Sequence, residues 1–344
     1  TMSLRTLVAP SKTQAKLRAS NMSFSSNCII RTVLGDISAD FDGHAQCHEH
    51  IFLRKGPSYQ CSKALLMDDE ARSAAELVQY RKSGGALLVD AQPGGYGRDA
   101  AVLKRLSAKS NVHIVAVTGF HKKCFLEKGA IVPRCTQAQL VSFLRQEIEV
   151  GMLTANGTLQ EAKAGLIKVS CDSGCYEDRD YMRMYHAAAE AAAITGGSVL
   201  VHTEAGVDVM PLIHLMEEHG IDPSRLILCH LDRTNRSLEY HQRLFKIGCY
   251  LCYDSIHRLK YLSDEEEMKL LLTMRERGNV DRMLLSLDTT NERLRAYSGV
   301  DMGLNYLLET WLPKMAQMGF SEEELKKMCC RNGALALAMK ERMQ

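Results

Sequence analysis

Short runs of apolar and β-branched residues recur along the chain, and each ends at polar or glycine positions before an amphipathic stretch begins. Eight such runs occur, at 43–51, 86–92, 113–120, 165–171, 198–204, 226–231, 249–254 and 283–288. The stretches between them space their apolar residues three or four apart, notably at 69–83, 136–151, 179–195, 209–220, 237–247 and 264–278, with a closing segment at 321–343. Strands that alternate with helices in this way are typical of repeated βα units. Eight units predict an α/β fold of the (β/α)8 barrel type.

The chain has the length of one barrel and shows no break that would divide it. Its 344 residues are 46% hydrophobic and 24% charged, with seven prolines and no linker or shift of composition. The first 27 residues carry four basic side chains and no acidic one before Asp36, a composition typical of disordered arms, transit peptides or added segments. We therefore expect an N-terminal arm at 1–27 and a single barrel domain at 28–344.

Charge and cysteine content exclude several classes of protein. Lys+Arg 43 against Asp+Glu 41 gives a net charge of +2, so no basic field indicates a nucleic-acid partner. No run of about 18 apolar residues predicts a membrane span. Twelve cysteines in a long chain without a secretion signal favour buried, reduced thiols and a cytoplasmic location. The remaining partner class is a small-molecule substrate, and a homodimer is compatible with it.

Side chains that bind metals stand at the ends of five predicted strands. The residues concerned are His48, His50, Lys168, His202, His230 and Asp288. In a parallel barrel these ends meet at one face, where barrel enzymes place their catalytic residues. Side chains two positions apart on a strand point the same way, so His48 and His50 can chelate one cation while Glu49 faces away. A single buried histidine is usually a hydrogen-bonded core residue, but the coincidence of five strand ends favours coordination.

Lys168 is the unusual member, since an ammonium group would repel metal ions. Burial and neighbouring cations both favour its neutral form. A neutral amine can add carbon dioxide, and the carbamate then has two anionic oxygens that can bridge two divalent ions. The alternatives are a lysine that extends out of the barrel and one that pairs with Asp288.

These residues stand in motifs that resemble the phosphotriesterase-like family of the amidohydrolase superfamily, over about residues 28–343. The motifs are His48-Glu49-His50, Ala-Gly-Leu-Ile-Lys-Val at 164–169, His202, His230 and Ser-Leu-Asp-Thr-Thr at 286–290, in that order. The resemblance implies that one metal is held by His48, His50, Lys168 and Asp288. It implies that the other is held by Lys168, His202 and His230. Zinc is the expected metal, with manganese or cobalt as alternatives for nitrogen and oxygen ligands.

A water bridging two divalent ions loses a proton near neutral pH, so we expect attack by a metal-bridging hydroxide. Asp288 is the expected proton acceptor and donor, and Lys168 the expected metal bridge, so these two are the predicted catalytic residues. Glu49 is expected to support the first strand or a helix behind it.

Two loops predict an anionic substrate. The loops after the seventh and eighth strands hold Arg258, Lys260, Tyr261, Arg293, Arg295 and Tyr297. Barrels often bind phosphate at this place, and arginine grips phosphate or carboxylate with two hydrogen bonds. Tyr96 and Arg98, after the second strand, are expected to line the same pocket. A solvated charged surface is the alternative for the two basic loops.

The pattern of the last loop resembles family members that hydrolyse sugar lactones, including phosphorylated ones, so a lactonase is the expected function. A carboxylesterase or phosphotriesterase of the same family, and a barrel that binds without catalysis, are the alternatives. A one-metal deaminase is disfavoured because it typically lacks the bridging lysine.

Overall fold

Eight parallel strands form the centre of the protein. The computed structural model describes residues 28–127, 134–154, 157–235 and 237–340. The strands are β3 (His44–Glu49), β4 (Gly85–Asp90), β5 (His113–Gly119), β6 (Leu166–Cys171), β7 (Ser198–Thr203), β8 (Leu226–Cys229), β9 (Tyr250–Tyr253) and β10 (Met283–Leu285), each paired with the next. The last strand returns to the first, because the backbone N–H of Asp288 donates to the carbonyl of His48 at 3.1 Å. The predicted (β/α)8 barrel is confirmed.

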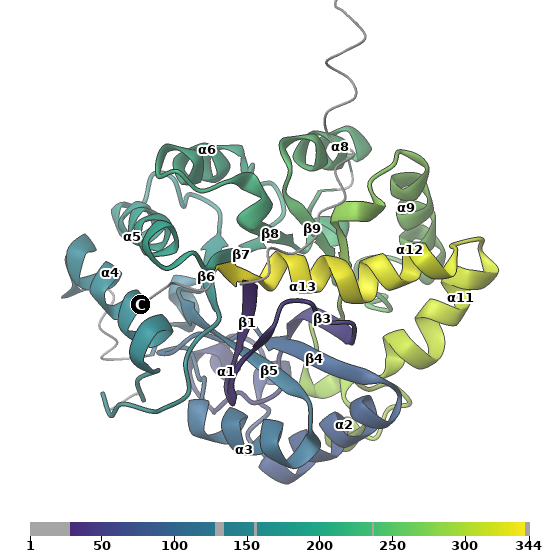
Figure 1. The fold of residues 1–344 in the computed structure, drawn as a ribbon, viewed down its shortest axis with the longest axis horizontal. Coiled ribbons are helices and arrows are strands. Elements are labelled where there is room, and N and C mark those ends of the chain that lie inside the picture. The colour runs from purple at the N-terminus through teal and green to yellow at the C-terminus, as the bar shows by residue number, and fades with distance from the viewer. Residues whose placement is uncertain (1–27, 128–133, 155–156, 236, 341–344) are drawn as a thin grey trace, which may run out of the picture.

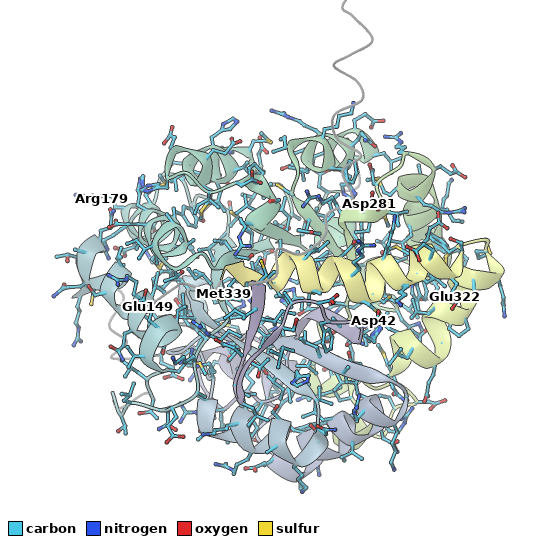
Figure 2. The ribbon with its side chains drawn as sticks, in the orientation of Figure 1. Asp42, Glu149, Arg179, Asp281, Glu322 and Met339 are labelled. Atoms are coloured by element: carbon cyan, nitrogen blue, oxygen red, sulfur yellow. The ribbon has the colours of Figure 1, made fainter. Side chains whose placement is uncertain are left out.

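Helices surround the strands as an outer ring (Figure 1). The longer ones are α2 (Glu70–Lys82), α3 (Ala100–Ser110), α4 (Gln137–Arg145) with its extension η4 (Gln146–Val150), α5 (Arg179–Thr195), α6 (Met210–Glu218), α8 (Leu238–Ile247) and α9 (Asp264–Glu276). Side-chain caps fix several starts: Asp69 accepts from two backbone N–H groups of α2, and Ser263 forms a capping box with Glu266. Charged side chains such as Arg179 and Glu149 lie on the outside of this ring (Figure 2).

Short helical turns occupy the loops. They are α1 (Pro57–Cys61), η1 (Lys63–Leu65), η2 (Lys123–Phe125), η5 (Pro223–Arg225), α7 (Leu231–Thr234), η6 (Val280–Arg282), η7 (Asn291–Arg293) and α10 (Arg295–Ser298). The chain then continues through η8 (Leu307–Trp311), α11 (Leu312–Gln317), α12 (Glu322–Lys326), η9 (Lys327–Arg331) and α13 (Asn332–Leu337). The eight strands and the amphipathic segments were predicted, whereas α3 and most of these turns were not.

A small antiparallel sheet and α13 cover the N-terminal end of the barrel, and α13 crosses in front of the strands in Figure 1. The sheet has the order β11–β1–β2, from Met339–Lys340, Cys28–Thr32 and Gly35–Ser38. Ala334, Ala336 and Leu337 of α13 pack with apolar residues inside the barrel. The predicted closing helix is therefore too long: it ends at Leu337, and β11 follows. Residues 1–27 and 341–344 lie outside the described residues.

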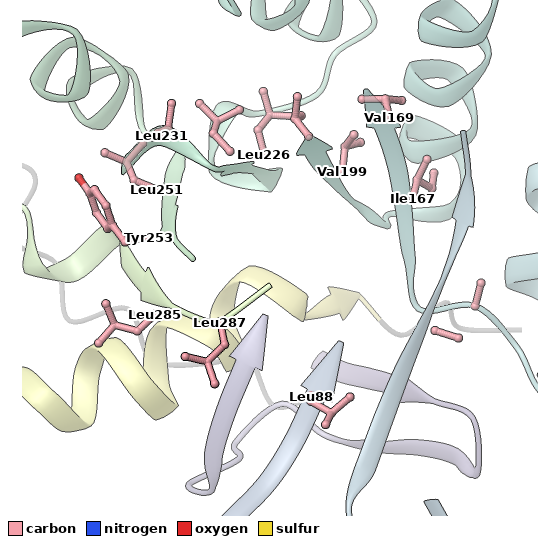
Figure 3. Packing of buried hydrophobic residues seen from close by; sticks show 14 of the residues in the cluster. Leu88, Ile167, Val169, Val199, Leu226, Leu231, Leu251, Tyr253, Leu285 and Leu287 are labelled. Atoms are coloured by element: carbon pink, nitrogen blue, oxygen red, sulfur yellow. The ribbon is translucent and has the colours of Figure 1, made fainter. Parts of the chain in front are cut away.

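Successive side chains on each strand alternate between the barrel interior and the helix layer. On β6, Ile167 and Val169 belong to the apolar cluster between strands and helices (Figure 3). Leu166 belongs to the inner cluster, and Lys168 shares its face by the period of two. Because the inner apolar residues and α13 fill the N-terminal half, the polar interior positions gather at the C-terminal ends of the strands.

Candidate metal and substrate site

The six predicted metal-binding residues are buried at the C-terminal end of the barrel. Their exposed fractions are His48 0%, His50 5%, Lys168 0%, His202 7%, His230 1% and Asp288 6%. The ring of His230 lies 4.6 Å from that of His48 and 4.5 Å from that of His202, between centroids. Residues far apart in the sequence, such as His48 and Asp288, thus meet in one cluster, as the strand-end pattern predicted.

Several imidazole nitrogens in this cluster face one another or face the carboxylate of Asp288. The Nδ1 of His202 lies 2.8 Å from the Nε2 of His230. The Nε2 of His48 is buried without a hydrogen-bond partner among the described residues. It lies 3.9 Å from Asp288 Oδ1, and His50 Nε2 lies 3.5 Å from the same oxygen. One ligand atom each from His48, His230 and Asp288 fit within 4.8 Å of one another. Buried polar atoms in this arrangement fit a divalent cation with nitrogen and oxygen ligands.

Lys168 lies at the centre of the barrel wall, on β6. Its Nζ donates to the carbonyl of Ala91 at 2.7 Å. Burial lowers the pKa of Lys168 to about 8, so its neutral form is accessible near neutral pH. Gly119 on the neighbouring strand β5 allows that strand to approach Lys168 closely. Its φ is +112°, and a Cβ at this position would lie 2.1 Å from the carbonyl oxygen of Lys168. A glycine is required there for this close approach.

Asp254, directly after β9, joins two of the histidines and was given no role in the sequence analysis. The Nδ1 of His48 donates to one carboxylate oxygen at 2.9 Å, and the Nδ1 of His230 to the other at 2.7 Å. Although burial alone would raise the pKa of Asp254, His230 and His48 hold it below its ordinary value. The carboxylate therefore directs the Nε2 atoms of both rings into the cluster. Its place at a strand end was the available signal.

Asp288 is held by two arginines on the side away from the histidines. Arg233 donates to its Oδ2 at 2.8 Å, and Arg258 contacts the same oxygen. Burial raises the pKa of Asp288, but Arg258 and Arg233 outweigh it and hold the pKa well below its ordinary value. Asp288 is thus ionised, with Oδ1 directed to the imidazoles. Arg233, on α7 after β8, was missed by the sequence analysis.

The predicted substrate residues of the last loop separate into two groups. Arg293 is 8% exposed and donates from Nη2 to the carbonyl of Ile256 at 2.6 Å, while its Nε and Nη1 are buried with no partner in the described part of the chain. Arg295 is exposed and lies 3.3 Å from Asp301. Tyr297 donates to the carbonyl of Asp69 at 2.8 Å, against α2. The structure therefore does not bring Arg295 or Tyr297 to the histidine cluster, because α10 turns both toward the outer helices.

The other predicted substrate residues also differ from one another. Lys260 is exposed and lies 4.9 Å above the ring of Tyr261. Tyr96 is 1% exposed, and its hydroxyl has no partner among the residues described. Arg98 does not line the pocket as expected, since it forms a buried ion pair with Glu147 at 2.6 Å.

Three residues from the loops after β5 and β7 surround His202. Glu204 Oε1 lies 2.9 Å from its Nε2 and also contacts Lys122. The ring of His121 lies 4.9 Å from that of His202, and burial holds the pKa of His121 well below its ordinary value. None of these three neighbours was predicted. They lie after β5 and β7, whose loop conformations carry no strong sequence pattern.

Glu49 faces away from the metal-binding histidines, as the alternation predicted. One oxygen accepts from the backbone N–H of Leu287 at 2.7 Å, and the other from Thr289 at 3.1 Å. Glu49 therefore joins the first strand to the segment after the last one, rather than to a helix.

Comparison with known proteins identifies the family. Residues 28–336 match the Phosphotriesterase family. The chain belongs to this family. Its members are metal-dependent hydrolases, and this phosphotriesterase-family protein is accordingly a hydrolase.

Relatives and solved structures agree with this family. A phospho-furanose lactonase of Mycoplasmopsis synoviae is 30% identical over 338 residues, 92% of this chain and 93% of that protein. The human N-acetyltaurine hydrolase is 28% identical and covers 80% of each chain. A lactonase structure from Listeria monocytogenes has a TM-score of 0.83 at 26% identity, covering 91% of this chain and 100% of that one. No helix among the described residues has both the length and the apolar character needed to cross a membrane.

Proposed function

We propose that this phosphotriesterase-family protein is a binuclear-metal-dependent lactonase acting on sugar lactones that carry a phosphate or a similar anionic group. The observation that carries the proposal is the buried donor set in which the Nδ1 of His202 and the Nε2 of His230 lie 2.8 Å apart. The relatives named phospho-furanose lactonase support the substrate class.

These residues would hold two divalent ions, with Lys168 as a ligand of both. His48, His50, Lys168 and Asp288 would hold one ion, and Lys168, His202 and His230 the other. Zinc suits these ligands, and manganese or cobalt would also be accepted. Bound ions would supply Lewis-acid polarisation of the substrate and water that ionises near neutral pH.

A carbamylated Lys168 is part of this proposal. The amine has a pKa lowered to about 8 by burial, so a neutral fraction is present to add carbon dioxide. The product would replace an unwanted positive charge by two oxygen ligands. The lowering is moderate despite full burial because the charge of Cys229, followed by those of Asp288, Asp90 and Asp254, raises the pKa of Lys168.

The protein's own side chains would position the reaction and move its proton. Asp254 fixes the tautomers of His48 and His230, so that their Nε2 atoms serve as ligands. Asp288, kept ionised by Arg233 and Arg258, would accept a proton at Oδ1 and return it to the leaving oxygen.

Arg293 is the best-supported residue for the anionic group of the substrate. It is buried near Arg258 and Asp288, and two of its nitrogens have no partner among the residues described. A buried guanidinium with free N–H groups fits a phosphate oxygen, whose contact would restore the hydrogen bonds lost on burial. Arg258 and Tyr96 are proposed as further contacts, and Lys260 as an outer one.

An activity screen on the metal-loaded enzyme tests the proposal. The panel contains phosphorylated and plain sugar lactones, a carboxylic ester, a phosphotriester and N-acetyltaurine. Fastest turnover of a phosphorylated lactone is expected. Preference for the phosphotriester or the amide would overturn the substrate class, and failure of the protein to take up metal, together with no turnover, would overturn the catalytic function in favour of a binding barrel. A small anionic substrate, a cytoplasmic location and a homodimer remain compatible expectations.

A further inference from the structure

Two exposed thiols on separate loops meet at the catalytic face. Cys61 ends α1, in the loop after β3, and Cys124 lies in η2, in the loop after β5. The Sγ of Cys61 lies 3.7 Å from the carbonyl oxygen of Cys124, although 63 positions separate them in sequence. All twelve cysteines lie in the described part of the chain, and these two are the exposed ones. The two cysteines that are exposed are therefore the same two that lie next to each other.

The two thiols are also close enough to affect each other's ionisation. The pKa of Cys124 is raised by partial burial, then by the charge of Cys61 and by a hydrogen bond that the Cys124 thiol donates to Cys61. Two thiols within hydrogen-bond range cannot both ionise easily, but one thiolate next to one thiol is the arrangement from which a disulfide forms.

The loop that carries Cys61 also contacts the opposite side of the barrel mouth. The side-chain amide of Asn291 donates to the carbonyls of Lys63 at 2.9 Å and Leu66 at 3.0 Å. Asn291 begins η7, which ends at Arg293. The segment from Pro57 to Leu66 thus runs between the loop after β5 and the loop after β10.

The loop that carries Cys124 is itself anchored toward His202. Lys123 pairs with Asp178 at 2.8 Å, at the start of α5. Lys122 contacts Glu204, whose carboxylate lies 2.9 Å from the Nε2 of His202. A bond between Cys61 and Cys124 would therefore join a loop of the mouth to a segment that is already fixed to the site.

We propose that Cys61 and Cys124 form a reversible intramolecular disulfide that fastens α1 to η2 across the mouth of the site. With hydrogen peroxide as oxidant, one thiol is oxidised to a sulfenic acid and one water leaves. The second thiol then attacks the sulfur of the sulfenic acid and displaces its hydroxyl group. The hydroxyl group takes the proton of the attacking thiol and leaves as a second water. Two thiols and one peroxide thus give one disulfide and two waters. Exposed disulfides of this kind are readily reduced by a dithiol, so the bond is reversible.

The test uses the full-length protein, reduced and then treated with a small excess of hydrogen peroxide. Free thiols counted after denaturation should fall from twelve to ten, and peptide mapping should identify Cys61 joined to Cys124. Dithiothreitol should restore all twelve. Cys61→Ser and Cys124→Ser should each abolish the cross-link. Cys135→Ser, at a half-buried cysteine on another segment, is the matched control and should leave it intact.

Hydrogen exchange provides the second measurement. Amides of 57–66 should exchange more slowly in the oxidised wild type than in the reduced one, and this difference should disappear in Cys61→Ser. Retention of twelve thiols, a sulfinic acid without a cross-link, or a cross-link between two copies of the chain would each overturn the proposal. Unchanged exchange in a fully cross-linked sample would overturn the fastening of α1. Neither readout depends on the substrate proposed above.

Discussion

The Nδ1 of His230 lies 2.7 Å from Asp254, whose other oxygen accepts from His48. In the proposed function, His48 would bind one metal ion and His230 the other, although their rings lie only 4.6 Å apart. A single buried carboxylate therefore sets the orientation of a ligand for both ions.

Asp254→Asn should weaken metal binding while leaving the barrel folded. The amide cannot accept from both imidazoles as a charged carboxylate does, so their tautomers are no longer fixed. Loss of such a supporting contact typically lowers metal affinity about 10–100-fold. Competition with a chelator measures this change. Asp232→Asn is the matched control, because Asp232 is equally buried but accepts from Ser255 instead of a histidine. Equal loss in both variants would show a general effect of changing a buried carboxyl group in this part of the barrel.

Lys168→Ala should leave a folded protein with reduced metal content and little activity. A short carboxylic acid should partly restore both, because its two oxygens can take the place of the proposed carbamate. Metal content and turnover are measured with and without the acid. A bare ammonium at Lys168 in a crystal of the metal-loaded protein would contradict the carbamate.

Arg293→Ala should lower kcat/KM on a phosphorylated lactone and leave the unphosphorylated parent nearly unaffected. Loss of a charged hydrogen bond to phosphate corresponds to roughly 1.5–3 kcal/mol, or about one to two powers of ten. Arg295→Ala is the matched control, since Arg295 is exposed and pairs with Asp301. An equal loss on both substrates would assign Arg293 to the fold or the metal site.

The strand-end residues were predictable from sequence because local pattern determines them. An apolar run such as 226–229 defines a strand, and the residue that follows, His230, must then lie at the barrel mouth. The partner of that residue is not local. Asp254 reaches His230 across the neighbouring strands β8 and β9, and the pattern of one strand does not show which side chain of the next strand it will meet.

The substrate loop was predicted less well because short turns decide where its side chains point. Arg293 ends η7 and is buried, whereas Arg295, two positions later, begins α10 and is exposed. Nothing in the alternation of charges distinguishes these two arginines. The strands at Cys28–Thr32 and Gly35–Ser38 were also missed. This hairpin is stabilised by contacts with the barrel that lie far away in sequence, such as the hydrogen bond from the Val33 N–H to the carbonyl of Ile114 at 2.9 Å.

His44 should make the free energy of unfolding depend on pH, at the end of the barrel remote from the metal site. It begins β3, is 6% exposed and packs its ring 5.8 Å from that of Tyr80. Burial lowers its pKa from 6.5 to about 4. Between these two values the unfolded chain binds a proton that the folded protein does not. His44 therefore stabilises the fold above pH 6.5, and this contribution is lost as the pH falls toward about 4.

A non-titrating replacement isolates this effect. The packing lost in His44→Gln lowers the free energy of unfolding by an amount that does not depend on pH. It therefore adds only a constant to the difference in this free energy between wild type and variant, and the change of that difference with pH reports the titration of His44. That difference should change by about 3 kcal/mol between pH 7 and pH 4, with the wild type losing more stability on acidification. Urea unfolding of metal-free protein measures it. His113→Gln, at a half-buried histidine whose pKa burial also lowers, is the matched control and should give a smaller change. A constant difference across the range would mean that His44 titrates alike in the folded and unfolded states.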